Sequence, residues 1–427
     1  MKKGIILSIS GGNILTSFGG TEKVIISHQK MFNAAGIQYL YIYPVRKSLK
    51  SVEFYSYWGM VYNGSFKGLY TTNQIIYEIG RSCGGSGGLL KIHVHHLKNI
   101  ELDKLKKILD TFDKNEIFLY GHDYYLICNQ YNLMRNGKEY CGIGRPCKEK
   151  CGNCLYLQDS HEAEERVAFV EKYAHRVKII TPSDAAGNII RRSLPELADK
   201  VTVIYHQKLI GEYRENIEPV KAGDKLKIAF CGLQLDIKGW PQFLETVYSI
   251  KDNNPGYEFY HLGRAKRKYD HIKNIEVGFQ DGMLTMTEAL RKYKIDCVVL
   301  WSQCAETYSY VYYECCSANT FIITHENSGN VADMVKRNKN GVILKSQEQL
   351  YELLADKEKI IRMINDMRQL RIFGPQRMED NDAIVDLSLC STVKYNNEIH
   401  NMKKTIKQTV IEILYKRNIE HKKANGG

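Results

Sequence analysis

The chain has 427 residues, 44% of them hydrophobic and 25% charged, which is typical of a globular protein of two or three domains. This composition excludes a disordered chain and a small disulfide scaffold, and no run approaches the roughly 18 apolar residues that a membrane-spanning helix needs. The formal net charge of +12 is dispersed along the sequence and favours anionic partners such as phosphates, nucleic acid or an acidic membrane surface.

The first half of the chain alternates short apolar runs with amphipathic segments. Residues 4–10 predict a strand, residues 21–35 a helix with one apolar face, and residues 37–43 a second strand. The alternation continues with strands at 91–95, 116–120, 177–181 and 201–205 and helices at 98–112, 161–174 and 183–192. Such a rhythm is typical of a doubly wound parallel sheet.

A polar stretch at 206–225 interrupts this rhythm, which then restarts. Strands are predicted at 226–231, 257–261, 274–277, 295–300, 320–324 and 341–344, and helices at 240–251, 283–293, 309–318 and 329–336. We therefore expect an α/β protein with two Rossmann-like, doubly wound domains facing a cleft, at 1–206 and 222–375. A helical tail is expected at 376–427, with a long charged helix at 395–423. Open sheets bind ligands at the carboxyl ends of their strands, so the cleft is the expected active site.

Two glutamates, Glu306 and Glu314, flank the start of the helix predicted at 309–318. The first-turn amides of such a helix, around residues 308–310, have no partner within the helix and can bind phosphate. Carboxylates beside them can accept hydrogen bonds from sugar hydroxyls. The spacing alone also fits a solvated helix face, so the surrounding motifs decide between the two interpretations.

Five short motifs stand in a fixed order along the chain. They are Phe-Gly-Gly-Thr-Glu-Lys-Val at 18–24, Tyr-Gly-His-Asp at 120–123, Phe-Cys-Gly at 230–232 with Lys-Gly-Trp at 238–240, the acid pair, and Asn-Ser-Gly-Asn-Val-Ala-Asp at 327–333. With them the sequence resembles the retaining glycosyltransferases of family 4 (group 1), of the bacterial surface-polysaccharide type. The resemblance implies the GT-B fold, in which two Rossmann-like domains face each other.

The resemblance also assigns roles to residues of these motifs. It implies a catalytic set in which Glu306 holds hydroxyls of the donor sugar, Lys238 contacts the diphosphate and His122 lines the sugar side of the cleft. The expected donor-binding set is Gly19, Gly20, Gly232, Lys238, Tyr308, Ser309, Tyr310 and Glu314. Within it, Gly20 lets the phosphate approach and Glu314 holds the ribose. Leu233 departs from the family, which usually has an arginine there as a second phosphate-binding cation.

The implied reaction moves a sugar from a nucleotide-diphosphate sugar to a hydroxyl of a glycan or lipid-linked acceptor, with retention of configuration and without a catalytic metal. Front-face attack is favoured by the resemblance, and double displacement stays open. We expect a cytoplasmic protein that associates peripherally with the inner membrane face. One alternative is a catalytically inactive nucleotide-sugar binding protein, which Leu233 favours. Another is a nucleic-acid binding protein, which the dispersed charge disfavours.

Five cysteines fall within one short region, at Cys128, Cys141, Cys147, Cys151 and Cys154. Cys151 and Cys154 have the two-residue gap of a zinc knuckle. We expect four of the five to hold a structural zinc ion, either Cys128 or Cys141 with Cys147, Cys151 and Cys154, with free thiols as the alternative. Some family-4-like enzymes have a Cys-rich insertion after the His-Asp motif, and this resemblance implies that residues 128–154 lie beside the acceptor side of the cleft.

Two histidines, His93 and His95, alternate at the end of a predicted strand. Alternating residues share one face of a strand. We expect this pair to face the cleft rather than to bind a metal.

Overall fold

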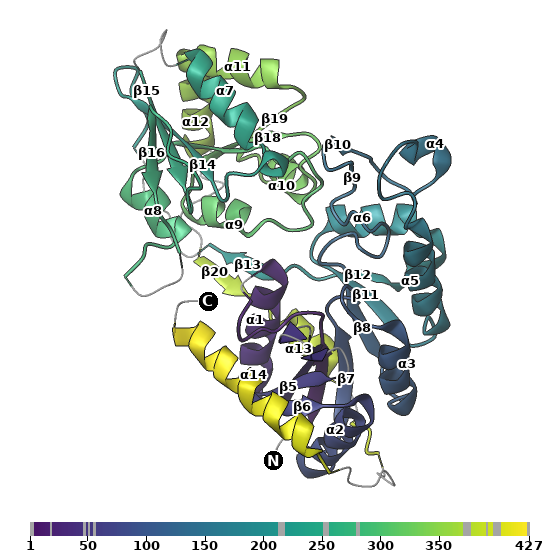
Figure 1. The fold of residues 1–427 in the computed structure, drawn as a ribbon. Helices are drawn as coiled ribbons and strands as arrows, with labels where there is room; N and C mark the ends of the chain where they lie inside the picture. Colours follow the sequence, from purple (N-terminus) through teal and green to yellow (C-terminus); the bar gives the residue numbers. More distant parts are fainter. Residues whose placement is uncertain are drawn as a thin grey trace.

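The computed structural model of the chain has two lobes, each built on one β-sheet flanked by helices (Figure 1). The structure describes residues 4–17, 19–45, 48–49, 52–53, 57–211, 218–250, 256–278, 282–369, 377–389, 392–395 and 403–424. Among the helices of these segments, none is both long enough and apolar enough to cross a membrane.

The first lobe contains an eight-stranded sheet in the order β12-β11-β8-β7-β1-β2-β5-β6. Its strands are β1 (Ile5–Ile9), β2 (Gln38–Pro44), β5 (Trp58–Tyr62), β6 (Ser65–Tyr70), β7 (Leu89–Val94), β8 (Ile117–Tyr120), β11 (Val177–Thr181) and β12 (Val201–Val203). The helices are α1 (Gly20–Ala34), α2 (Thr72–Ser86), α3 (Leu102–Thr111), α5 (Ser160–Lys172) and α6 (Asp184–Ser193). All five residues of β1 are buried, as expected for a parallel strand covered on both faces.

The segment from β5 to α2 had no predicted element. β5 and β6 form an antiparallel hairpin at the sheet edge, joined by Asn63 and Gly64, whose φ angles are +46° and +82°. An Asn-Gly pair between apolar runs is a strong hairpin signal, so the sequence did contain the information that predicts this turn. Shorter elements of the lobe are β3 (Ser48–Leu49), β4 (Val52–Glu53), β9 (Met134–Arg135), β10 (Glu139–Tyr140) and α4 (Lys148–Cys151).

The second lobe contains a six-stranded parallel sheet in the order β16-β15-β14-β17-β18-β19. Its strands are β14 (Leu226–Cys231), β15 (Tyr257–Leu262), β16 (Ile272–Ile275), β17 (Cys297–Leu300), β18 (Phe321–His325) and β19 (Gly341–Leu344). The helices are α7 (Trp240–Ile250), α8 (Met286–Lys292), α9 (Tyr310–Ser317), α10 (Asn330–Asn338), α11 (Gln347–Ala355) and α12 (Lys357–Gln369). The prediction of two doubly wound α/β halves is confirmed.

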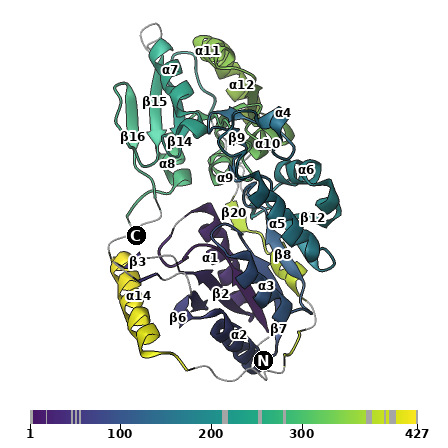
Figure 2. The same ribbon diagram turned by 45° about the vertical axis from the view of Figure 1, so that its right-hand side comes forward.

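The tail differs from its prediction, because its first described segment is a strand and not a helix. β20 (Arg377–Asp380) pairs antiparallel with β13 (Gln207–Ile210), which lies inside the predicted polar linker. This ribbon lies between the two lobes (Figure 2). The chain then returns to the first lobe through α13 (Ala383–Ser388) and α14 (Ile406–Ala424), so the long helix begins later than the predicted residue 395.

Helix α14 covers the exposed edge of the first sheet. The amide of Leu69 on β6 donates to Glu412 Oε2 over 2.8 Å, and Gln408 Nε2 donates to the carbonyl of Leu69 over 2.9 Å. Ile411 of this helix joins the same apolar cluster as Ile384 of α13. Side chains of the helix thus satisfy backbone groups that an edge strand otherwise leaves open.

Candidate functional site

The start of α1 forms the first wall of the site. The amide of Gly19 donates to Glu22 Oε2 over 3.0 Å, so the helix caps one of its own free donors. A Cβ added at Gly20 would meet nothing within 4 Å, so no protein contact requires a glycine there. The open space leaves room for another molecule to approach the backbone. Phe18, which precedes this pair in the motif, lies outside the described residues.

Glu306 lies in the loop between β17 and α9 and is held from two sides. The hydroxyl of Ser302 donates to Glu306 Oε1 over 2.8 Å. Behind it, Gly329 has φ +58°, and a Cβ there would lie 2.6 Å from the backbone nitrogen of Glu306. The amide of Asn330 also donates to the Glu306 carbonyl over 2.9 Å. The predicted 327–333 loop therefore fixes the position of Glu306.

Lys238 forms an ion pair with Glu306. Lys238 follows β14 at the end of a short 3-10 turn, Asp236–Lys238. Burial alone would lower its pKa, but the Glu306 carboxylate offsets this and the pKa of Lys238 is raised. Its ammonium group therefore stays charged across the physiological pH range.

The Lys238 pair lines a cavity of about 240 Å³, which we call the β14 cavity. Gly232, Leu233 and Ser309 line it as well. Ser309 has φ +66°, a left-handed backbone that is strained for a residue other than glycine and is frequent at functional sites. Leu233 is 51% exposed, and none of the described residues that line this cavity is an arginine, so none of them supplies the second cation that the family usually has.

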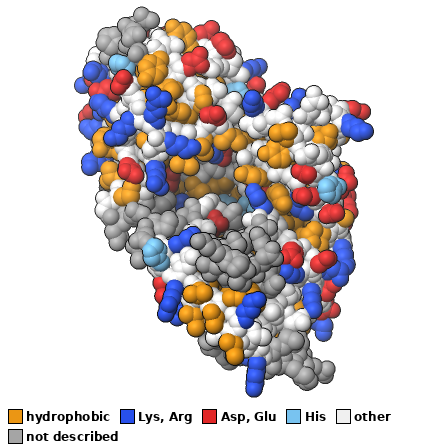
Figure 3. Space-filling view, in the orientation of Figure 1, with side chains coloured by type: hydrophobic (Ala, Val, Ile, Leu, Met, Phe, Trp, Pro, Cys, Tyr) orange, Lys and Arg blue, Asp and Glu red, His pale blue; other side chains and the backbone are white. Residues whose placement is uncertain are grey.

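A second, larger cavity of about 620 Å³ lies between the lobes, and we call it the inter-lobe cavity. Figure 3 shows the surface hollowed between the two lobes. Gly19, Gly20 and Lys23 line the cavity from α1, and Tyr310 and Glu314 line it from α9. Val311 lines both cavities, so the two adjoin at the first turn of α9.

Glu314 faces Lys23 across the inter-lobe cavity. Lys23 Nζ lies 4.0 Å from Glu314 Oε1 and 3.9 Å from the centre of the Tyr310 ring. Burial raises the pKa of Glu314, and Lys23 partly opposes that rise. Burial likewise lowers the pKa of Lys23, opposed by Glu314 and Asp380. Lys23 and Asp380 are site residues that were not predicted. Lys23 belongs to the quoted motif, but its role depends on a pairing across the lobes.

His122 lies where the two lobes touch. The hydroxyl of Thr307 donates to the His122 carbonyl over 2.6 Å, and the hydroxyl of Ser183 donates to the Thr307 carbonyl over 2.6 Å. The His122 ring packs parallel to that of His95, with Nε2 3.0 Å from His95 Nδ1. Burial, reinforced by nearby histidines, lowers the pKa of His122 to about 3, so the ring is neutral at pH 7.

The two predicted sets divide between the cavities. Glu306, Lys238, Gly232 and Ser309 line the β14 cavity, and Gly19, Gly20, Tyr310 and Glu314 line the inter-lobe cavity. His122 and Tyr308 line neither. His206 lies between these two residues, because its ring centre is 5.6 Å from that of His122 and 4.7 Å from that of Tyr308.

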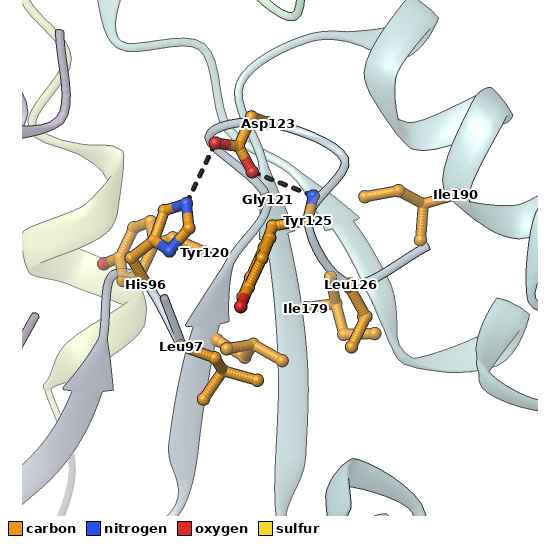
Figure 4. Close-up of a pocket in the computed structure, with 10 residues that line it drawn as sticks. His96, Leu97, Tyr120, Gly121, Asp123, Tyr125, Leu126, Ile179 and Ile190 are labelled. Carbon is orange, nitrogen blue, oxygen red and sulfur yellow. Dashed lines mark hydrogen bonds and ion pairs between the residues drawn. The ribbon is translucent and has the colours of Figure 1, made fainter. Parts of the chain in front are cut away.

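A small cavity lies behind the His122 loop (Figure 4). Asp123 points toward it and accepts hydrogen bonds from His96 Nε2 and from the amide of Tyr125, both over 2.9 Å. Its volume of about 20 Å³ accommodates about one water molecule, so it is too small for a sugar. These contacts shape the His122 loop instead.

His93 and His95 do not face the cleft, and that prediction is wrong. Both are fully buried in the first lobe beneath α1, where they meet His28. Tyr120 Oη lies 3.0 Å from His93 Nδ1, and Tyr39 Oη lies 3.4 Å from His95 Nε2. The alternation correctly put the two rings on one face, but the packing of α1 against the sheet determines which face that is.

Four of the five clustered cysteines line one cavity of about 20 Å³, namely Cys128, Cys141, Cys151 and Cys154. Cys147 is exposed and is not part of its lining. Among the described residues, one group of three potential metal ligands (His, Cys, Asp or Glu) has its ligand atoms within 4.8 Å of one another, and it consists of His28, His93 and His95. No three of the described cysteine sulfurs therefore lie this close together. The thiols thus converge on one place without forming a tetrahedral set.

No protein-family profile and no curated protein matches the sequence. Among solved structures, a glycosyltransferase from Rickettsia africae matches with a TM-score of 0.53 and 13% identity, over 88% of this chain and 95% of its own. Sucrose-phosphate synthase from Thermosynechococcus elongatus matches with a TM-score of 0.52 and 13% identity, over 86% of this chain and 94% of its own. The chain therefore has the GT-B fold of two facing Rossmann-like halves, as predicted.

Proposed function

We propose that this protein is a glycosyltransferase that moves a sugar from a nucleotide-diphosphate sugar to an acceptor hydroxyl. One observation carries the proposal. Lys238, Glu306 and Glu314 surround the start of α9 in two adjoining cavities, opposite the open start of α1. The cation and the free helix amides can bind a phosphate, and the two carboxylates can accept hydrogen bonds from sugar hydroxyls.

The donor phosphates are proposed to lie in the β14 cavity. The ammonium group of Lys238 would turn partly away from Glu306 to contact the phosphates. The first amides of α9 would donate hydrogen bonds to the phosphate oxygens. The negative charge on the leaving diphosphate grows as the glycosidic bond breaks. A fixed ammonium group at that place stabilises the transition state more than the ground state.

The ribose of the donor is proposed to lie in the inter-lobe cavity. Glu314 would accept hydrogen bonds from its hydroxyls, since the carboxylate is buried and paired only loosely with Lys23. The cavity of about 620 Å³ is within the size range of small-molecule sites. The apolar side chains of Val277 and Met286 on its wall would pack against the nucleotide.

Transfer is proposed to retain the anomeric configuration by front-face attack. The bond between the anomeric carbon and the diphosphate oxygen breaks, and the acceptor oxygen bonds to that carbon from the same side. The acceptor proton passes to an oxygen of the leaving diphosphate. The Glu306 carboxylate already contacts Lys238 and Ser302. These contacts fit a carboxylate that holds sugar hydroxyls better than one that acts as a nucleophile.

His122 lines neither cavity, but His206 connects it to Tyr308 beside the start of α9. We propose that it borders the sugar side of this site as a neutral imidazole. Its low pKa keeps it uncharged at pH 7, so it would act as a hydrogen-bond donor or acceptor and not as a cation.

The acceptor is proposed to be a glycan or lipid-linked hydroxyl in cell-surface polysaccharide synthesis, which the family resemblance supports.

The test is a screen of melting temperature against nucleoside diphosphates and their sugars, followed by measurement of nucleotide release. A ligand that binds only the folded state raises the melting temperature. We expect the nucleoside diphosphate of one base to raise the melting temperature, and we expect the protein to turn over a nucleotide sugar with the same base. Stabilisation without release would favour the inactive binding protein that Leu233 allows. No stabilisation by any nucleotide would contradict the proposal.

We also propose that the cysteine insertion holds a structural zinc ion. The convergence of Cys128, Cys141, Cys151 and Cys154 on one cavity supports these four as the ligands, so that Cys128 and Cys141 both belong to the set and the predicted Cys147 does not. Zinc prefers four thiolates at ~2.3 Å, so the side chains would have to turn inward to bind it. The ion would stabilise a segment that has few regular elements of its own.

A further inference from the structure

The outward face of α14 carries a stripe of exposed apolar side chains. Ile406, Val410, Ile413 and Leu414 are 87%, 51%, 50% and 44% exposed. Their spacing of four, seven and eight residues places them on one side of a helix that turns roughly 100° per residue. Large aliphatic side chains that line up in this way on a surface mark a place where something docks.

The orientation of this stripe is fixed by the opposite side of the helix. Gln408, Ile411 and Ile419 are buried against the first lobe. Tyr415 Oη accepts a hydrogen bond over 3.1 Å from Asn13 Nδ2, in the loop that leads to α1. The apolar stripe therefore cannot turn inward without breaking the contacts that cover the edge strand β6.

Basic side chains surround the stripe. Residues 403–424 contain seven Lys or Arg and two Glu, and Glu412 is already paired with Lys404. Helical spacing puts Arg417 in line with the stripe and Lys407 and Lys416 about a quarter turn to either side. All three of these basic residues are exposed. Figure 3 shows hydrophobic side chains bordered by Lys and Arg over α14.

We propose that α14 docks this protein onto the surface of an anionic lipid bilayer. An apolar stripe flanked by cations is what an interfacial helix presents, with aliphatic groups among the acyl chains and ammonium groups among the phosphates. A second copy of this chain would bring the same positive charges together, and nucleic acid would leave the aliphatic centre of the face unpaired. The charge of the face therefore favours anionic lipid over both.

This docking would place the bilayer beside the cleft. α14 touches the loop before α1 through Tyr415 and Asn13, and α1 lines the inter-lobe cavity. The inference does not depend on the proposed sugar transfer, because bilayer binding is measured without substrate. An inactive protein that binds vesicles and an active one that does not are distinguishable outcomes.

The test is co-sedimentation of the full chain with vesicles of phosphatidylcholine that contain phosphatidylglycerol, compared with phosphatidylcholine alone. We expect the wild type to partition at least about tenfold better into the anionic vesicles. Val410→Ser with Ile413→Ser should lower that partition by a similar factor, since both side chains leave the acyl region. Lys407→Glu with Arg417→Glu should abolish the preference for anionic lipid.

The matched control is Tyr351→Ser, which removes an exposed aromatic side chain from α11 in the other lobe. It should bind vesicles like the wild type. Equal binding to both kinds of vesicle, or unchanged binding by both double variants, would overturn the proposal. A wild-type dimer that Val410→Ser with Ile413→Ser converts to a monomer, without vesicle binding, would also overturn it and assign the face to a second copy.

Discussion

The two halves of the cleft share their architecture and differ in their chemistry. In each half, a buried parallel strand runs through a loop into a helix that faces the other lobe: β1 into α1, and β17 into α9. The α9 half carries Glu306 and Glu314 and borders Lys238. The α1 half offers an open glycine backbone and the charged side chains of Glu22, Lys23 and Lys30.

This difference indicates a division of labour. Fixed charges placed around one helix start suit the phosphates and ribose of a donor, whose charge changes during the reaction. The open glycine backbone at the start of α1 leaves room for a ligand to enter and leave. Substitutions around α9 should therefore separate effects on chemistry from effects on binding.

The largest expected effect is on turnover. Glu306→Gln keeps the shape of the side chain but removes the charge that pairs with Lys238 and holds sugar hydroxyls. We expect turnover to fall by about 100-fold or more, while nucleotide affinity changes much less. Steady-state rates and calorimetric titration measure the two separately.

The matched control for Glu306→Gln is Glu326→Gln, which alters an exposed carboxylate after the next strand, β18. It should leave turnover unchanged. If Glu306→Gln turned over at the wild-type rate, Glu306 would have no place in the site.

Glu314→Gln should show the opposite division. Losing charge-assisted hydrogen bonds to the ribose should weaken nucleotide binding by about tenfold, with a smaller effect on turnover at saturating donor. Titration with the nucleoside diphosphate is the measurement. Equal loss of affinity in Glu314→Gln and Glu306→Gln would break the proposed separation.

Acid should destabilise the half of the molecule that holds the histidines. Burial lowers the pKa of His28 and His122 to about 3 and that of His93 well below its usual range. Between pH ~6.5 and ~3 the unfolded chain binds protons there and the folded chain does not, so the free energy of unfolding falls as the pH falls.

His28→Gln checks this pH dependence by denaturant unfolding at several pH values. Its slope of unfolding free energy against pH should be lower by up to ~1.4 kcal/mol per pH unit, the amount for one proton. His175→Gln, at an exposed position, should leave the slope unchanged. An unchanged slope in His28→Gln would show that this ring takes up its proton in the folded state.

Cys151→Ser should remove the proposed zinc ion and lower the melting temperature, whereas Cys147→Ser should retain the metal. Elemental analysis of purified protein measures both, with about one zinc ion per chain expected in the wild type. A wild type with less than about half an ion per chain would favour free thiols.

The smallest expected effect comes from Leu233→Arg. This substitution returns a cation to the wall of the β14 cavity at a half-exposed position. We expect nucleoside diphosphate to bind about threefold more tightly, because solvent screens the added charge. Weaker binding would mean that the phosphates lie elsewhere.

Much of the fold follows from local pattern, because strands buried on both faces are continuous runs of Val, Ile and Leu between helices. β14 begins and ends at the predicted residues, Leu226 and Cys231. The β13–β20 ribbon could not be predicted in this way. Its partners, such as Gln207 and Asp380, lie far apart in the sequence and have no periodic signal.

The site was predictable where motifs carry it and not where packing decides it. Glu306 and Lys238 stood in recognisable motifs, and the structure brings them into contact. Lys23 meets Glu314 only because the lobes face each other. The strand period placed His93 and His95 together but could not choose the face, which depends on how α1 packs.

A structure of the protein with the nucleoside diphosphate that stabilises it most would test the proposed donor site directly. We expect the phosphates beside Lys238 and the first amides of α9, with the ribose hydroxyls on Glu314. A nucleotide bound on the α1 half without contact to Lys238 or Glu314, or bound outside the cleft, would contradict this expectation.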